Sequence, residues 1–349
     1  MSDTTFRILD ASHPEDFAAW MALWQGWPDH EVFAHPAYVQ LFAGDGDRAL
    51  CAAMESASGN VLYPFIRRPI AGGDSCDITS AYGYGGAFVT TPAAATLAPE
   101  FYGAFDAWAR EARVVSEFIR FALFESELLP YAGEREKRQD NIVRTLAIDE
   151  PAMWMEFEHK VRKNVQKAQR SGITIEFDPD GARLSDFLRI YYGTMDRRDA
   201  AAGYHFPESF FRAFLTDLAG NAVFVHAIMN EVVVSTELVL LSARSCYSFL
   251  GGTNESAFAA RPNDALKFET IKCAKARGLS QYVLGGGASP DDGIFRYKRA
   301  FAPHGVVPFH IGKRILDPAA YDALVLRRQS HTGDELAAPP GFFPAYRAP

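Results

Sequence analysis

Several features are scarce in this sequence of 349 residues, and each scarcity excludes a class of protein. Cysteines are few and far apart, with no CxxC pair and no cysteine–histidine cluster: Cys51, Cys76, Cys246 and Cys273. This spacing supports neither a zinc site nor a disulfide framework, so we expect no metal and reduced, mostly buried thiols. No stretch approaches the ~20 apolar residues of a membrane span. The N-terminus also lacks a charged-then-apolar signal pattern, so we expect a cytoplasmic location without stable membrane insertion.

An excess of positive charge is also missing. The formal net charge is −8, which argues against a dedicated nucleic-acid coat protein. It leaves tRNA open as a partner, because local basic patches matter more than the total charge. A hydrophobic content of 48% is ample for packed cores. The length predicts two domains at ~150 residues each.

The first 150 residues read as one α/β unit. Apolar runs at 50–54 and 61–66, joined by a Ser-Gly-Asn turn, predict a pair of strands. A helix is expected to begin near Pro99, because Phe101, Phe105 and Trp108 recur at helical spacing. Further strands are predicted at 116–122 and 142–148, separated by a charged loop at 134–138. The first domain is therefore predicted at residues 1–150.

A second α/β unit is predicted at residues 151–330, followed by an irregular Pro- and Ala-rich tail at 331–349. It opens with one long helix at 151–170, and strands are expected at 223–229, 232–241 and 245–250. Pro262 suits the first turn of a later helix, and Gly278 closes it. The fold class is thus α/β (α+β), with mixed, mostly antiparallel sheets flanked by helices. No internal repeat is visible in the sequence.

Short motifs carry a resemblance to a known family. In chain order they are Tyr82–Gly86, Arg162–Gly172, Thr194–Arg197, Tyr204–Pro207, Leu250–Gly252, Leu284–Gly287 and Asp292–Lys298. Their order and spacing resemble the landmarks of the Fem aminoacyltransferases, a branch of the GNAT acyltransferases, over most of residues 80–325. The resemblance implies two GNAT-like subdomains. It also implies an enzyme that moves an aminoacyl group from aminoacyl-tRNA, used as a co-substrate without a cofactor, to an amine. That acceptor is a peptide, a peptidoglycan precursor or a natural-product intermediate.

Lys298 is the first candidate for catalysis. Amide formation from an activated ester needs charge stabilisation for the tetrahedral oxyanion, and a lysine can supply it. Lys298 also resembles the Fem lysine associated with the transferring acyl group. The alternative is a solvated lysine on a helix whose aromatic neighbours pack inward. Tyr297 either lines the same cavity or belongs to the core. No Ser/His/Asp or Cys/His arrangement stands out, and none is needed, since the acceptor amine is itself the nucleophile.

A row of basic residues is the candidate site for phosphates of tRNA, of a nucleotide sugar or of coenzyme A. It recurs at i, i+3, i+7 and i+10 of the predicted 151–170 helix: Lys160, Lys163, Lys167 and Arg170. Arg162 is a weaker candidate for the same role. The alternative is an ordinary solvated helix face.

The remaining candidates are proposed to bind substrate. Arg197 resembles a family arginine associated with acceptor phosphates, although Asp196 and Asp199 lie close enough in sequence to pair with it. Tyr204 belongs to the adjacent motif. Two glycine-containing segments suit either a binding wall or a tight turn: Tyr82, Tyr84, Gly85 and Gly86 in the first half, and Gly285, Gly286 and Gly287 in the second.

The sequence also departs from the family. The first lysine of the chain is Lys137, too late for the early family lysine that holds an acceptor diphosphate. Residues 118–122 lack the family's Asp-Pro carboxylate, for which Glu125 or Glu127 would have to substitute. An acyl-CoA-dependent N-acyltransferase acting on an amino sugar, peptide or small amine is therefore an alternative, although no GNAT pyrophosphate loop is evident. A non-catalytic GNAT-like binding protein is the third hypothesis.

Overall fold

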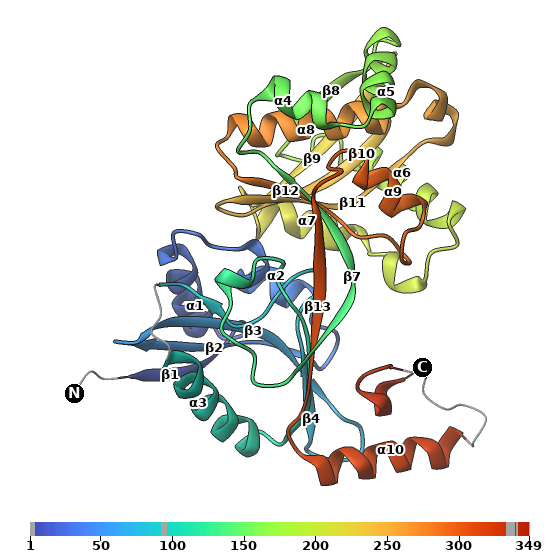
Figure 1. Cartoon of the computed structure of the whole chain (residues 1–349). Helices are drawn as coiled ribbons and strands as arrows, with labels where there is room; N and C mark the ends of the chain where they lie inside the picture. The colour runs from blue at the N-terminus through green and yellow to red at the C-terminus, as the bar shows by residue number, and fades with distance from the viewer. Residues whose placement is uncertain (1–3, 92–95, 333–338, 340, 349) are drawn as a thin grey trace. The chain divides into compact units, whose positions relative to one another are not determined.

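The computed structural model describes residues 4–91, 96–332, 339 and 341–348. The chain divides into two compact units (Figure 1). Unit 1 comprises Met1–Arg138 with Phe309–Pro349, and unit 2 comprises Gln139–Pro308. These boundaries differ from the predicted ones at 150 and 330. Residues 139–150 belong with the second unit, and residues 309–330 return to the first.

Unit 1 is built on a mixed sheet with the order β1-β2-β3-β4-β6-β13. Its strands are β1 (Thr5–Asp10), β2 (Arg48–Ser56), β3 (Gly59–Pro69), β4 (Cys76–Thr79), β6 (Val114–Arg120) and β13 (Val306–Ile315), with the short β5 (Phe88–Val89) paired to β3. Neighbours are antiparallel except β4 and β6, which are parallel. The return of residues 309–349 to this unit follows from the pairing of β13 with β6.

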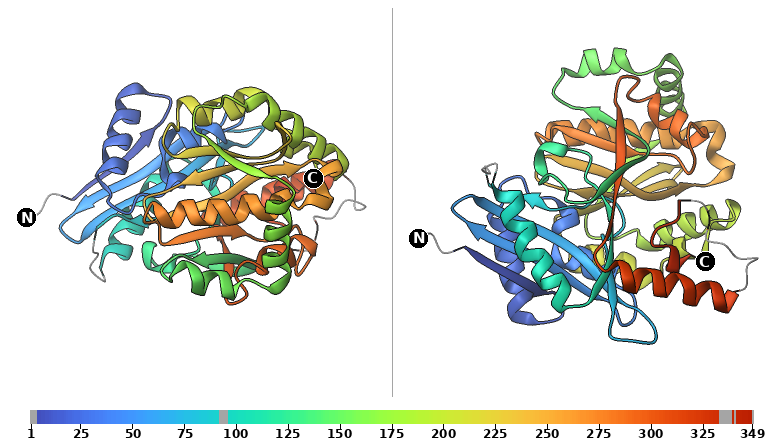
Figure 2. Two further views of the ribbon diagram at one scale, coloured as in Figure 1. Left: turned by 90° about the horizontal axis from the view of Figure 1, so that it is seen from above. Right: turned by 60° about the horizontal axis from the view of Figure 1, so that its bottom comes forward.

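Helices cover both faces of the unit 1 sheet. They are α1 (Pro14–Gly26), α2 (Pro36–Leu41), α3 (Leu97–Glu111) and α10 (Pro318–Thr332). Phe101 and Phe105 of α3 pack on Tyr63 of β3, and Figure 2 shows α1 on the opposite side of the strands from α3. Burial on both faces explains why β2 and β3 are apolar at consecutive positions rather than alternating.

Unit 2 repeats this sheet pattern, with the order β8-β9-β10-β11-β12-β7. Its strands are β7 (Glu134–Thr145), β8 (Thr174–Asp178), β9 (Ala222–Met229), β10 (Val232–Leu241), β11 (Ser245–Thr253) and β12 (Gln281–Gly285). Neighbours are again antiparallel except one pair, β11 and β12. That parallel pair joins only residues 245–247 to 281–283, so the rest of β11 diverges from β12.

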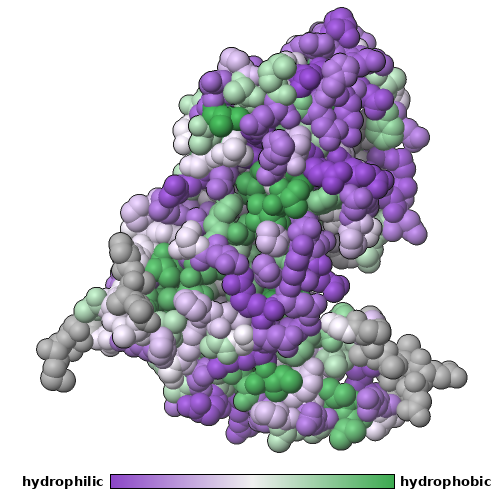
Figure 3. All heavy atoms as spheres, in the orientation of Figure 1, coloured by the Kyte–Doolittle hydropathy of each residue, from purple (hydrophilic) through white to green (hydrophobic). Residues whose placement is uncertain are grey.

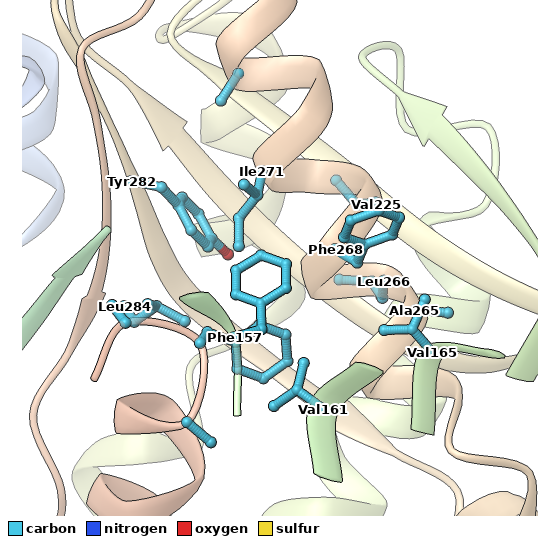
Figure 4. Packing of buried hydrophobic residues seen from close by; sticks show 14 of the residues in the cluster. Phe157, Val161, Val165, Val225, Ala265, Leu266, Phe268, Ile271, Tyr282 and Leu284 are labelled. Atoms are coloured by element: carbon cyan, nitrogen blue, oxygen red, sulfur yellow. The ribbon is translucent and has the colours of Figure 1, made fainter. Parts of the chain in front are cut away.

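The helices of unit 2 enclose its sheet: α4 (Glu150–Glu156), α5 (His159–Arg170), α6 (Leu184–Arg197), α7 (Glu208–Thr216), α8 (Pro262–Ala276) and α9 (Gly293–Arg299). Phe187 of α6 packs edge-on against Phe224 of β9. A separate core cluster joins α5 and α8 to the strands, and Figure 4 shows Val161 and Val165 beside Ala265 and Leu266.

Some elements differ from the prediction. The single helix expected at 151–170 is broken into α4 and α5 at Phe157 and Glu158, because buried Phe157 is extended and the Arg162 guanidinium binds the carbonyls of Met155 and Phe157. The loop predicted at 134–138 is the start of β7. In the predicted irregular tail, Tyr346 and Arg347 hydrogen-bond to buried Asp77. The predicted mixed α/β fold class is confirmed. Within the described residues, no helix is both long enough and apolar enough to span a bilayer.

Short 3-10 segments complete the description, and they lie at Val32–Ala34, Glu125–Glu127, Ala202–Tyr204, Glu255–Ala260 and Ala345–Arg347.

Candidate active site

The turn between β12 and α9 is fixed by Asp292. One carboxylate oxygen caps α9 by accepting the Phe295 N–H at 2.7 Å, and the other accepts the N–H of Ala288 at 2.8 Å. A side chain at Gly287 would come within 2.4 Å of this carboxylate. Glycine is therefore required there, which favours the tight-turn interpretation for this part of the glycine run.

Lys298 lies on the inner side of this turn. Its Nζ donates a hydrogen bond of 2.7 Å to the carbonyl of Gly286, which brings together two motifs that the sequence singled out separately. A Cβ at Gly286 would meet Asn141 Oδ1 of β7 at 2.6 Å, so the backbone of Gly286 can lie this close to β7 only without a side chain. Gly285, with φ of 78°, supplies the bend before it.

The charge state of Lys298 is perturbed. Burial lowers the pKa of its ammonium group to about 8, with the positive charge of Lys267 acting in the same direction and Glu237 and Asp292 opposing it. The side chain is half-buried rather than solvated. An ammonium group has three donors, and one is used by Gly286. Lys298 can therefore act both as a hydrogen-bond donor and as a proton donor near neutral pH.

Tyr297 points into the unit from the same helix. Its hydroxyl accepts a hydrogen bond of 2.9 Å from Asn263 at the start of α8, and its ring packs edge-on against Phe301. Burial raises the pKa of Tyr297 well above its ordinary value, so the hydroxyl keeps its proton. These contacts place Tyr297 in the core that supports Lys298.

A buried polar cluster behind Lys298 was missed by the sequence reasoning. Lys267 of α8 forms an ion pair with Glu237 of β10 and donates to Ser248 Oγ of β11 at 2.5 Å. Tyr282 of β12 donates to Glu237 at 3.2 Å. The sequence did contain a signal for this cluster, because Glu237 is a charged residue inside the apolar run of β10. A charged group is buried only where it has a partner, so this position predicts a buried ion pair.

The first turn of α8 holds a carboxyl group of its own. Asp264 is buried, accepts a hydrogen bond of 3.1 Å from Asn164 of α5, and has its pKa raised by burial. Helix N-termini attract anions through their free N–H groups and the helix dipole. At α8 the N-cap side chain makes no hydrogen bond to these N–H groups, and the acidic residue of the first turn is Asp264.

The predicted basic row lies exposed along α5, opposite the apolar face that packs on α8: Lys160, Lys163, Lys167 and Arg170. Lys160 pairs with Glu158 at 3.3 Å. The α5 region, at the top of the view in Figure 3, has a hydrophilic surface. Arg162 is not part of this row, because its guanidinium is engaged at the α4–α5 junction.

Arg197 and Tyr204 lie elsewhere in unit 2. Arg197 ends α6, donates to the carbonyl of Thr253 at 3.3 Å and stacks on Phe258 at 5.2 Å. The nearby carboxylate of Asp196 pairs with His205 instead. Tyr204 is 42% exposed, and its carbonyl accepts a hydrogen bond from Tyr191.

The tyrosine–glycine segment belongs to unit 1. The ring of Tyr84 packs edge-on against Phe33 and Phe309, and burial raises the pKa of its hydroxyl. The carbonyl of Gly85 accepts the Ala122 N–H at 2.7 Å, and Gly86, with φ of 121°, lies against Leu128. Tyr82 is 39% exposed and is the residue of this segment that could contact a ligand.

A chain of buried polar side chains in unit 2 has the residue types of a nucleophilic triad. His226 contacts Thr236 Oγ1 at 2.9 Å and Asp178 Oδ2 at 3.3 Å. All three side chains are buried, and Asp178 also accepts backbone N–H groups of Ala182 and Arg183. These three hydrogen-bonded side chains therefore stabilise the fold rather than contact a substrate. Among the described residues, no group of three or more His, Cys, Asp or Glu could hold a metal ion.

Comparisons with known proteins agree with this architecture. Residues 156–299 match the family model described as an acetyltransferase (GNAT) domain. None of the curated proteins matches the sequence. The structure of FemX is similar with a TM-score of 0.67 at 12% identity, over 88% of this chain and 98% of that chain.

Two further solved structures share the fold. The C-terminal domain (DUF2156) of a putative lysylphosphatidylglycerol synthetase from Agrobacterium fabrum gives a TM-score of 0.54 at 14% identity, over 89% of this chain and 97% of that chain. L-PGS from Bacillus licheniformis gives 0.51 at 15% identity, over 92% of this chain and 98% of that chain. The predicted resemblance to the Fem-like branch is thus confirmed at the level of the fold, and residues 156–299 match a GNAT domain.

Proposed function

We propose that this chain is an N-acyltransferase that forms an amide bond by moving an aminoacyl group from aminoacyl-tRNA to an amine. The GNAT domain at residues 156–299 supports the acyltransferase class. The observation that carries the proposal is the state of Lys298, which is half-buried, anchored on Gly286 and has its pKa lowered to about 8. The proposed reaction requires no metal and no cofactor.

The proposed reaction needs few protein groups. The amine nitrogen attacks the ester carbonyl carbon, a C–N bond forms, and the C–O bond to the ribose of the tRNA breaks. The amine loses a proton and the departing ribose oxygen gains one. Lys298 in its charged form donates a hydrogen bond to the tetrahedral oxyanion or a proton to the departing oxygen. With a pKa of about 8, roughly nine-tenths of it is charged at pH 7.

Two features favour tRNA as the donor. The exposed basic row on α5 can contact successive phosphates of a nucleic acid. The first turn of α8 carries the buried acidic group of Asp264, which disfavours binding of the pyrophosphate of coenzyme A there. FemX and L-PGS, the neighbours in fold, do not establish the donor at 12% and 15% identity.

An acyl-CoA is the competing donor, favoured by the description of the matched domain as an acetyltransferase domain. In that case the basic row on α5 would bind the phosphates of coenzyme A. The acceptor amine is proposed to belong to a peptide, a peptidoglycan precursor, a natural-product intermediate or an amino sugar.

A donor screen tests the proposal. Purified protein is incubated with the charged aminoacyl-tRNA pool and, separately, with a panel of acyl-CoAs, and bound and released products are identified by mass spectrometry. Selective binding or deacylation of one aminoacyl-tRNA is the expected result. Turnover of an acyl-CoA alone would overturn the donor assignment, and the absence of both would overturn the activity.

A further inference from the structure

The start of unit 2 places an amide side chain against the glycine to which Lys298 is bonded. Gln139 is the first residue of the unit and belongs to β7. A Cβ at Gly286 would lie 2.7 Å from Gln139 Nε2, so this amide nitrogen packs directly on the backbone of Gly286. The carbonyl of the same glycine accepts the hydrogen bond of 2.7 Å from Lys298 Nζ. Two nitrogen groups, one from β7 and one from α9, therefore meet at one residue of the turn between β12 and α9.

The alternation of side chains along β7 explains this approach. Successive side chains of a strand point to opposite faces, so Gln139 and Asn141 share one face while Ile142 points to the other. Ile142 is fully buried in the core of unit 2. Asn141 is also buried, and its Oδ1 would lie 2.6 Å from a Cβ at Gly286. Both amide side chains thus face the glycine, with Asn141 enclosed and Gln139 half-buried.

The amide group of Gln139 has hydrogen-bonding capacity left. A glutamine amide carries two N–H donors and a carbonyl acceptor. Within the part of the chain that the structure describes, the Gln139 side chain makes no hydrogen bond to another residue. Lys298 uses one of its three donors on Gly286. Both side chains can therefore donate further hydrogen bonds to an oxygen atom that binds beside Gly286.

Such a pair of donors matches what acyl transfer needs. When the amine attacks the ester carbonyl, the electron pair of the C=O bond moves to oxygen, and the tetrahedral intermediate carries a negative charge there. Donors aimed at this oxygen contribute strongly to such reactions, and glutamine side chains are among the groups that supply them. A neutral amide adds no second positive charge, so it stabilises the oxyanion without displacing the proton of Lys298.

We propose that Gln139 is a second catalytic residue of unit 2, which donates a hydrogen bond from Nε2 to the oxyanion beside Lys298. This inference rests on the proposed function and gives the oxyanion a donor from each of two elements. As the intermediate collapses, the C=O bond re-forms, the C–O bond to the departing oxygen breaks, and Lys298 gives that oxygen its proton. The proton that the amine loses then returns to Lys298, so the protein is unchanged after each transfer. Gln139 takes no part in proton transfer, because a carboxamide does not titrate.

Single-turnover amide formation with full-length protein and the donor found by the screen tests this role. Gln139→Met, which keeps the length of the side chain without the amide, should slow the reaction about 100-fold at unchanged donor affinity. Gln139→Glu, which keeps the shape, should be slower still, because its carboxylate repels the oxyanion. The pH profile of Gln139→Met should parallel that of wild type, since no titrating group is lost. Gln169→Met removes an exposed glutamine of α5 outside the basic row and should leave the rate unchanged.

The order of the two Gln139 variants separates catalysis from packing. If Gln139 only covered Gly286, the isosteric Glu would be tolerated better than Met, and that order in folded variants would overturn the proposal. A wild-type rate in Gln139→Met, or a loss of donor affinity without a change in rate, would overturn it as well. Circular dichroism shows which variants fold. If Gln139→Met does not, Gln139→Glu decides alone, and a wild-type rate in that variant would contradict the role.

Lys298→Met in the same assay keeps the two claims apart. If Lys298→Met formed the amide at the wild-type rate, the proposed function of Lys298 would fail whatever the Gln139 variants show. A slow Lys298→Met beside a Gln139→Met of wild-type rate would refute only the second donor. Slow transfer in both variants, at unchanged donor affinity, supports an oxyanion bound by β7 and α9 together.

Discussion

Units 1 and 2 have the same order and direction of strands, but they differ in the charges that they bury. In both units a helix connects the one parallel strand pair: α3 joins β4 to β6, and α8 joins β11 to β12. Each unit also buries a glutamate that accepts a hydrogen bond from a tyrosine. Tyr63 donates to Glu117 in unit 1, and Tyr282 donates to Glu237 in unit 2.

The difference lies in the cation beside each glutamate. Lys267 is bonded directly to Glu237, whereas the Arg314 guanidinium is bonded to Asp106 and lies 4.0 Å from Glu117. Burial therefore raises the pKa of Glu117 to about 6. Unit 2 also continues from β12 into α9 and Lys298, while β6 is followed by the short 3-10 segment Glu125–Glu127. One scaffold thus supports a buried carboxyl group in unit 1 and, in unit 2, the lysine that we propose to be functional.

The assignment of β7 to unit 2 gives the largest expected effect. The fragment 139–308 should fold cooperatively, whereas the fragment 151–308, cut at the boundary expected from sequence, should not. The shorter fragment loses Ile142 and Leu146, which are buried in the core beside Tyr282, and leaves the β12 edge unpaired. Truncating such side chains costs about 2–5 kcal/mol each. Circular dichroism with thermal unfolding of both fragments checks this, and equal stability would place the boundary at 150 after all.

Replacing Glu117 by Gln should change the pH dependence of stability. A carboxyl group whose folded pKa is raised from 4.5 to about 6 stabilises the fold below pH 4.5, and this contribution is lost as the pH rises through 6. At pH 7 the buried, ionised carboxylate of Glu117 therefore lowers the free energy of unfolding by about 2 kcal/mol. The free energy of unfolding of Glu117→Gln relative to wild type should therefore rise by about this amount between pH 4.5 and pH 7.

Urea unfolding at several pH values measures the Glu117 effect. The matched control is Glu111→Gln, which removes an exposed carboxylate of the same unit and should show no comparable trend. A Glu117→Gln curve parallel to that of wild type would show that the carboxyl group of Glu117 does not titrate in this range.

The basic row of α5 gives the smallest expected effect. Replacing Lys163, Lys167 and Arg170 by Gln should weaken tRNA binding about 10-fold. The slope of log Kd against the logarithm of the salt concentration should fall by about 2–3, because each lost phosphate contact releases about one counterion fewer. Filter binding at several salt concentrations measures both quantities.

A unit 1 variant with the same loss of charge provides the comparison for α5: exposed Arg7, Arg110 and Arg113 all replaced by Gln. If both triple variants lost affinity and slope equally, the row on α5 would be no more than general surface charge.

Much of the fold could be predicted because its elements follow local rules. The apolar runs of β2 and β3, the helical spacing in α3 and the proline at the start of α8 each appeared within a few residues of the expected place. The pairing of β7 with β12 in unit 2 and of β13 with β6 in unit 1 could not be predicted. Strand pairing depends on contacts between residues that are distant in sequence. The sheet pattern that the two units share could not be predicted either, because it is defined by the order and direction of the strands and not by similar residues.

The candidate site divides in the same way. Lys298 and the glycine run were found through motifs, and the structure adds their hydrogen bond. Lys267 and Glu237 were missed because each is a common residue whose burial and pairing become visible only when α8 is laid against β10. The break in the 151–170 helix was missed because Arg162 binds carbonyls just upstream, a contact with no clear sequence signal.

The central claim is that Lys298 of unit 2 assists acyl transfer to an amine, and its replacement tests that claim most directly. With the donor found by the screen and a panel of amines, single-turnover amide formation is measured for wild type, Lys298→Met and Lys313→Met, the last removing a lysine of unit 1 that pairs with Glu136. Losing one oxyanion donor should slow Lys298→Met about 100- to 1,000-fold while donor affinity and Lys313→Met stay near wild type. A folded Lys298→Met that forms the amide at the wild-type rate would contradict the account, and a loss of donor affinity without a change in rate would make Lys298 a donor-binding residue rather than a catalytic one.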